Sequence, residues 1–289
     1  MSNIEGLLAT MKVRGFLSRT AKDEEVTQDV HTWSGAKDDA GQYRKSLFPK
    51  SACGDDSVYE KLIKAKSALS VAYYDHSLMW EKPFRLISNK AHADFDQLIQ
   101  QRLTGLRVAH DAFIKGYEAL KIAARDNGRG TEWKASDYPD PEKLAAGFSC
   151  DVYYSAIPTS SQFAASLAGD AIERAKAQLN SANEQRMEAA VSDVWRQIME
   201  PLENMIEKLS DPESRIFDSI VTNIQDVSSR IPALNIEGDQ ALSDAKARLD
   251  QLVAGLDPEA LRKNPSLRTS TAATAATLVA ALGSRKFAA

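Results

Sequence analysis

Residues 187–209 read MEAAVSDVWRQIMEPLENMIEKL, and this stretch organises the rest of the chain. Its apolar side chains recur every three or four positions, a spacing that places them on one face of an α-helix. These positions are Met187, Val191, Val194, Ile198, Leu202, Met205 and Leu209. Such a face needs apolar partners, so we expect a core helix from Gln162 to Leu209. Pro201 predicts a kink in it, because proline removes a backbone donor and crowds the preceding turn.

Two further helices are predicted after this stretch. Asp211-Pro212-Glu213 combines a capping side chain, a proline suited to the first helical position and an acidic residue favourable near a helix start. The helix that follows should end near Pro232, because the residue before a proline is pushed out of the α region. The two apolar stripes are Ile216, Ile220, Ile224, Val227 and Ile231, then Leu242, Ala245, Leu249, Leu252 and Leu256. Residues 161–261 are therefore predicted to form an antiparallel helical bundle or rod.

Residues 1–160 predict an α+β region. The three-and-four spacing of apolar residues indicates long helices at about residues 57–80 and 92–124. Apolar and polar residues alternate at about residues 9–18 and 148–157, which indicates two short strands. Because an isolated strand pair is only marginally stable, we expect these strands to pair with each other and to lie against a helix.

Shorter elements connect these long ones. We expect a helix from Glu24 to about Ser34, a second helical stretch in AKDDAGQYRKSLFPKSA after Gly35, and one or two helical turns in PEKLAAGF. FRLISN, after Pro83, is too short for more than a turn or a brief extended piece. The predicted fold class is thus mainly α: a long antiparallel helical bundle or coiled-coil-like rod with a small two-stranded β element.

Composition narrows the function classes. The chain has 289 residues, 43% of them hydrophobic, and a formal net charge of −4. The negative net charge argues against a protein that coats nucleic acid without sequence specificity. No apolar run approaches the roughly 18 residues needed to span a bilayer, and the first residues lack the pattern of a secretory signal. Cys53 and Cys150 stand alone, so they predict free thiols in a reducing compartment. We therefore expect a cytosolic protein without membrane partners.

The sequence contains no recognisable catalytic constellation. None of the four histidines stands in a metal-ligand pattern, and neither a phosphate-binding loop motif nor a nucleophile-elbow motif is present. Paired acidic residues such as Asp38-Asp39 and Asp55-Asp56 stand in polar, turn-prone surroundings, where carboxylates are usually solvated. The sequence accordingly predicts no catalytic, cofactor-binding or metal-binding residue and no enzyme activity.

Two groups of residues are candidates for contacts with nucleic acid or an acidic partner. Residues 262–289 form a basic, Ala/Thr-rich tail without acidic residues, readable as a weakly docked terminus or as an anion-seeking arm. Its basic residues are Arg262, Lys263, Arg268, Arg285 and Lys286. The second group interleaves aromatic and basic residues, which permits base stacking as well as core packing. It comprises Tyr73, Tyr74, Lys82 and Arg85.

Several segments together resemble a family of uncharacterised proteins encoded by bacteriophages and mobile elements. These are an early strand, GAKDDAGQYRKSLFP, HSLMWEKPFRLIS, DYPDPEKLAAGFSCDVYYSAIP and SDPESRIFDSIVTNIQ, and the likeness spans about residues 8–262. Members tend to be encoded near MoxR-type AAA+ ATPases, CobT-like von Willebrand-A proteins and genes for recombination or single-strand DNA binding. The resemblance implies a protein of the bacterial host's cytoplasm and supplies no catalytic residue.

Three hypotheses for function follow from the sequence. The first is a non-enzymatic phage accessory protein that acts through protein–protein interaction, either by self-association or as an adaptor to an AAA+ machine. The second is a DNA-binding accessory in phage replication or recombination, based on the basic tail and the aromatic-basic group. The third is a virion or scaffolding component, since helical rods with basic ends suit assembly.

Overall fold

The computed structural model describes residues 5–18, 20–34, 42–129, 133–160 and 169–286. The chain divides into two compact units. Unit 1 comprises Met1–Thr10, Tyr73–Gln97 and Tyr153–Ala289, and unit 2 comprises Met11–Ala72 and Leu98–Val152.

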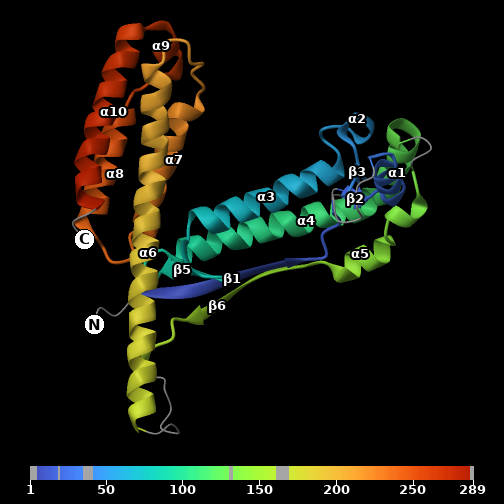
Figure 1. Cartoon of the computed structure of the whole chain (residues 1–289), viewed down its shortest axis with the longest axis horizontal. Helices are drawn as coiled ribbons and strands as arrows, with labels where there is room; N and C mark the ends of the chain where they lie inside the picture. Colours follow the sequence, from blue (N-terminus) through green and yellow to red (C-terminus); the bar gives the residue numbers. More distant parts are fainter. Residues whose placement is uncertain (1–4, 19, 35–41, 130–132, 161–168, 287–289) are drawn as a thin grey trace. The chain divides into compact units, whose positions relative to one another are not determined.

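The described residues form strands and helices throughout both units (Figure 1). The strands are β1 (Gly6–Arg14), β2 (Thr20–Lys22), β3 (Arg44–Ser46), β4 (Leu78–Glu81), β5 (Phe84–Ser88) and β6 (Ser149–Ala156). The helices are α1 (Glu24–Ser34), α2 (Lys50–Cys53), α3 (Val58–Asp75), α4 (His92–Ala124), α5 (Pro141–Gly147), α6 (Gly169–Ser210), α7 (Ser219–Leu234), α8 (Gln240–Val253), α9 (Pro258–Lys263) and α10 (Pro265–Lys286). A π-helical turn (Arg125–Arg129) and a 3-10 turn (Ala135–Asp137) complete the described elements.

The fold contains more β structure than the sequence predicted. Four strands form a sheet in the order β4-β5-β1-β6, and β2 pairs with β3 in a separate two-stranded sheet. The β1–β5 and β4–β5 pairs are antiparallel, with Gly6 opposite Ser88 and Leu78 opposite Leu86. The expected pairing of the strands near 9–18 and 148–157 is confirmed, because β1 and β6 are neighbours. The prediction of a mainly α bundle or rod with one two-stranded β element is wrong.

The strands β3 and β4, where the sequence predicts helix, lie in segments too short for periodicity to reveal them. β4 has only four residues, in which the buried Leu78 and Trp80 alternate with the exposed Met79 and Glu81, and the sequence predicts this segment as the end of the preceding helix. That helix, α3, ends at Asp75 instead of near residue 80. FRLISN was predicted as a turn or a brief extended piece, and the extended alternative is confirmed by β5, in which three successive residues are buried. Arg44–Ser46 was expected to be helical and forms β3, held by its pairing with β2.

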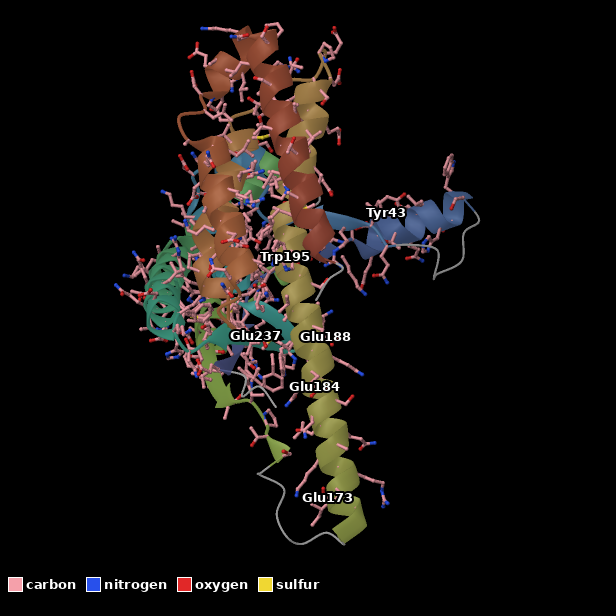
Figure 2. All side chains as sticks on the ribbon, turned by 90° about the vertical axis from the view of Figure 1, so that its left-hand side faces the viewer. Tyr43, Glu173, Glu184, Glu188, Trp195 and Glu237 are labelled. Carbon is pink, nitrogen blue, oxygen red and sulfur yellow. The ribbon has the colours of Figure 1, made fainter. Side chains whose placement is uncertain are left out.

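The core of unit 1 is built around α6, as the stripe at 187–209 predicted. Met187, Val194, Ile198, Leu202 and the later stripe residues are buried, and Val191 packs at the edge of the same cluster. α7 and α10 pack along α6 (Figure 1), and α8 packs against α7 and α10. The β4–β5 hairpin also packs on α6, so that hairpin residues and Trp195 (Figure 2) share one core. The hairpin residues in this cluster are Leu78, Trp80 and Leu86.

The N-terminal part of α6 contributes little to this core. From residue 171 to residue 186 no side chain is buried. Glu173 lies on the portion of α6 that extends past α7, α8 and α10 (Figure 2). The predicted start at Gln162 lies outside the described residues, which place the helix from Gly169 to Ser210 with Pro201 inside it. The predicted kink at Pro201 stays a prediction.

The boundaries of α7 differ from the expected ones. Residues 211–213 were expected to start the helix, but α7 begins at Ser219, and Pro232 lies inside its last turn. The side chain of Arg262 on α9 donates to the carbonyl oxygen of Ile216 at 2.9 Å, which holds the connection before α7 in a non-helical path. This bond joins residues far apart in sequence, so a local capping signal could not reveal it.

Most of the basic C-terminal segment belongs to the bundle. Residues 265–286 form α10, whose small and apolar residues are buried against α6 and α8. These residues are Ala272, Ala275, Leu278 and Leu282. The small size of alanine lets two helices approach closely, so an Ala/Thr-rich helix packs without a broad apolar stripe.

The core of unit 2 contains an aromatic cluster to which α3 and α4 both contribute residues. Ring centroids within it lie 4.9–6.2 Å apart, distances that give edge-to-face attraction in addition to area burial. The hydroxyl groups of Tyr117 and Tyr138 donate to the carbonyl oxygens of Pro139 (2.9 Å) and Leu47 (2.8 Å), so neither polar end is buried without a partner. The cluster comprises Phe48, Tyr59, Phe113, Tyr117 and Tyr138.

Gly15 permits a close backbone approach in the same unit. Its φ of 74° is unfavourable for other residues, and a Cβ there would lie 2.3 Å from the carbonyl oxygen of Gly147. The chain after β1 can therefore lie against the end of α5 only with glycine at this position.

His110 in α4 should make unit 2 less stable in mild acid. Its ring stacks on Phe148 with centroids 3.8 Å apart, and burial lowers the pKa of this imidazole below its ordinary value of 6.5. The unfolded chain then binds the proton more readily than the folded chain, so stability is full above pH 6.5 and decreases as the pH falls below it. NMR titration of the imidazole should give a midpoint below 6.5, and H110Q should lose this contribution to the pH dependence. A midpoint at or above 6.5 would contradict the assignment.

Leucine-to-alanine substitutions should show that the two parts of α6 contribute differently to stability. L202A removes a side chain that is 0% exposed in the core, and should lower the free energy of unfolding by about 2–5 kcal/mol. The matched change L179A, in the part without buried residues, should cost less than about 1 kcal/mol. Urea unfolding followed by tryptophan fluorescence measures both. Equal losses would show that the two parts are equally packed.

Candidate binding groove

An open groove in unit 1 is lined in part by two predicted site residues, Tyr74 and Arg85. It has a volume of about 710 Å³, and its walls come from the end of α3, β5, α6 and α7. The charged residues of this groove are Asp75, Arg85, Asp193, Arg196, Glu200, Asp226 and Arg230. Three guanidinium groups therefore face four carboxylates, and we refer to this site as the charged groove.

The wall formed by α6 carries a clamped arginine. Arg196 donates to Asp193 at 2.6 Å and to Glu200 at 2.6 Å, bonds made possible because residues three and four apart share a helix face. These hydrogen bonds raise the pKa of Arg196, with Asp193 contributing most. Gln197 also donates to Asp193, at 2.9 Å. The α6 wall thus presents a fixed pattern of alternating charge.

Arg230 joins the α7 wall to the end of α3. Its guanidinium lies 2.7 Å from a carboxylate oxygen of Asp75, and its Nε donates to the carbonyl oxygen of Asp226 at 3.1 Å. The Arg230 side chain is only 15% exposed, so its ion pair is more shielded from solvent than those on α6. This contact fixes α7 against the residues just ahead of the β4–β5 hairpin.

Arg85 on β5 holds the floor of the groove together. Its Nε donates to the hydroxyl group of Ser77 at 2.7 Å, and its Nη2 donates to the carbonyl oxygens of Tyr74 (3.1 Å) and Ser77. The guanidinium also lies 5.0 Å from the centre of the Tyr74 ring, within range of a cation–π contact. Burial lowers the pKa of Arg85, opposed by Tyr73, Asp193, Tyr74 and Asp75.

The groove suits recognition of a polar partner. Each of its three arginines already contacts a carboxylate or a carbonyl oxygen, so the walls are ordered before a partner arrives. The lining is close to neutral overall and therefore favours a ligand of mixed charge. Within the described part of the chain, no group of three or more histidine, cysteine, aspartate or glutamate residues is arranged to hold a metal ion.

The structure separates the four residues of the aromatic-basic group. Tyr74 and Arg85 contact each other and line the groove, with Tyr74 52% exposed. Tyr73 is buried, and its hydroxyl group donates to the carbonyl oxygen of Ala9 at 2.9 Å, so its ring is not available for stacking. Lys82 is exposed in the turn between β4 and β5.

The basic residues near the C-terminus do not belong to the charged groove. Arg262 and Arg268 line a second pocket beside the α6–α7 connection, and Lys263 pairs with Glu259 on α9. The backbone at Arg285 and Lys286 lies in α10, while their side chains are outside the described part of the structure. The nine predicted contact residues therefore do not form one surface among the described side chains.

Sequence reasoning missed the α6 and α7 residues of the groove. Asp193, Arg196 and Glu200 carry a signal in their i, i+3 and i+7 spacing, which places them on one helix face. That pattern is equally typical of a solvated helix surface. Only the packing of α7 and the β4–β5 hairpin on α6 turns this face into the wall of a groove.

Comparison with known proteins gave no relatives: no family model matches the sequence, and no curated protein or solved structure is similar to it. In the residues that the structure describes, no helix combines the length and apolar character required to cross a bilayer.

Replacing Arg85 by lysine should weaken unit 1 although the charge is kept. A single ammonium group cannot reproduce the forked bonds to Ser77 and the Tyr74 carbonyl, so R85K should lower the free energy of unfolding by about 1–3 kcal/mol. K82A, in the exposed turn next to it, should change it by less than about 0.5 kcal/mol. Urea denaturation tests both variants. If R85K unfolds like the parent protein, the fork does not stabilise the hairpin.

Proposed function

We propose that this chain is a non-enzymatic accessory protein that binds a segment of a partner protein in the charged groove. The observation that supports this most is the groove itself: about 710 Å³ of open space, with the α7 wall joined to the end of α3 by the Arg230–Asp75 ion pair and with Arg196 held by Asp193 on α6. A preordered surface loses little conformational freedom on binding, which favours affinity. Tyr74 adds an exposed aromatic ring of the kind enriched in interfaces between proteins.

The charges of the groove favour a polypeptide over a nucleic acid. Its four carboxylates outnumber its three guanidinium groups, so the lining has no excess of positive charge to attract a phosphate backbone. Nucleic-acid binding depends instead on basic side chains that displace counterions from phosphates. A peptide with charges of both signs can form hydrogen bonds with both kinds of side chain.

The resemblance to bacteriophage and mobile-element proteins indicates which kind of partner protein to expect. It favours an adaptor to an AAA+ machine in the cytoplasm of a bacterial host. The competing functions are self-association through the same groove, DNA binding in replication or recombination, and incorporation into the virion. Each of them predicts that a different molecule contacts the groove.

Site-specific photocrosslinking identifies the molecule that binds in the groove. A photoreactive amino acid replaces Asn223, an exposed groove residue on α7, and the full chain is expressed in the bacterial host. We expect a discrete adduct containing a second protein, with an AAA+ ATPase as the expected partner. The matched control places the same photoreactive residue at Arg248, an exposed position on α8 that does not line the groove.

Groove variants then test whether the adduct is specific. The double variant Y74A/E200A should reduce adduct formation by about tenfold, the effect of losing roughly 1.4 kcal/mol of binding free energy. The variant R248A should leave it unchanged, and circular dichroism confirms that both variants remain folded. An adduct containing only this chain would indicate self-association, and one lost on nuclease treatment would indicate DNA. Either result, or adducts of equal yield at Asn223 and Arg248, would refute the proposal.

A further inference from the structure

We propose that unit 1 holds a second, separate binding site, for the phosphate group of a nucleotide, in the pocket beside the α6–α7 connection. The pocket has a volume of about 490 Å³ and is lined by Ser214, Arg215, Ile216, Phe217, Arg262 and Arg268. Three of these six residues are arginines, and none carries a carboxylate. This composition contrasts with the charged groove, where acidic residues outnumber the arginines. We call this site the arginine pocket.

Arg268 supplies a positive charge that backbone groups hold in place. Its Nη1 donates to the carbonyl oxygen of Pro212 at 3.3 Å, and its Nη2 donates to those of Lys208 (3.1 Å) and Asp211. These carbonyl groups belong to the end of α6 and the connection after it. They fix the guanidinium without neutralising it, because a carbonyl oxygen carries only a partial charge.

Arg262 is fixed on the other side of the connection. Its Nε donates to the carbonyl oxygen of Ile216 at 2.9 Å, and its Nη2 pairs with Asp218. Asp218 occupies the N-cap position of α7, but its side chain makes no capping hydrogen bond there. Among the described residues, Arg262 is thus the one arginine of the pocket that pairs with a carboxylate, so the three arginines keep an excess of positive charge.

Hydrogen-bond donors remain in the pocket after these contacts. A guanidinium group has five N–H donors. Among the described residues, neither Nε of Arg268 nor Nη1 of Arg262 donates to a protein acceptor, and Arg215 makes no hydrogen bond. Two other acids stand just before the lining residues in sequence: Glu213 directly precedes Ser214, and Asp211 accepts from the backbone N–H of Glu213 at 3.0 Å, which commits one of its oxygens to the turn. Planar guanidinium groups with spare donors match the oxygens of a phosphate.

The exposed ring of Phe217 provides a surface for the base of a nucleotide. Its ring is 55% exposed, and the guanidinium of Arg215 lies 5.0 Å from the ring centre. An exposed aromatic ring next to a cation offers a stacking surface for a planar base. The pocket volume falls within the range of sites for small molecules. A nucleoside monophosphate satisfies both features, with its phosphate on the arginines and its base on Phe217.

Calorimetric titration of the full chain with AMP at low salt tests the proposal. AMP should bind, and R215A and F217A should each weaken it by about tenfold, equivalent to roughly 1.4 kcal/mol. R248A, which removes an exposed arginine on α8 outside the pocket, should not change the affinity. Arg215 and Phe217 are suited to substitution because both are exposed, so the variants should fold as the parent does.

Further ligands separate the contributions of phosphate and base. Inorganic phosphate should bind more weakly than AMP and should be sensitive to R215A but not to F217A, while adenosine should not bind. The proposal is overturned if millimolar AMP shows no binding, or if R215A and R248A bind AMP alike. Binding of a single-stranded oligonucleotide without binding of AMP also overturns it, and identifies the pocket as a contact for a nucleic-acid chain. Since the arginine pocket and the charged groove share no lining residue, failure here leaves the proposed partner site untouched.

Discussion

Unit 1 depends on one constraint, the burial of the apolar face of α6. From Met187 onward, this 42-residue helix carries apolar side chains that would be costly to leave in water. α7 and α10 cover that face along the helix, and the β4–β5 hairpin covers it near Trp195. Because the apolar face is fully used, the polar face with Asp193, Arg196 and Glu200 must point away from the core. The charged groove forms where the end of α3, β5 and α7 line a hollow together with that polar face.

The sequence predicted those elements whose signal is local and long. The predicted range of α4, residues 92–124, is observed without a shift, and the strand expected at 148–157 is Ser149–Ala156. Short elements stabilised by distant partners were missed. Arg44–Ser46 is a strand because it pairs with β2, more than twenty residues earlier, and no periodicity within three residues records such a partner. The expected start at residue 212 failed for the same reason, because Arg262 holds the connection before α7.

The candidate site was predictable only in part. The interleaving of aromatic and basic residues pointed to Tyr74 and Arg85, which do meet. The same signal included Tyr73, although neighbouring residues on a helix point about 100° apart, so that one can be buried while the next is exposed. The charges on α6 and α7 could not be distinguished from a solvated helix surface. Their role depends on which element packs beside them, and that information lies in the tertiary contacts.

Arginine has two different electrostatic roles in this unit, and the difference lies in its partners. In the charged groove, Arg196 and Arg230 meet carboxylates, so each positive charge is matched by a negative one. In the arginine pocket, Arg268 meets carbonyl groups, which orient the side chain and leave its full charge in place. A count of basic residues in the sequence treats these arginines alike. A site able to attract an anion needs the second arrangement, because an arginine already paired with a carboxylate would have to give up that partner first.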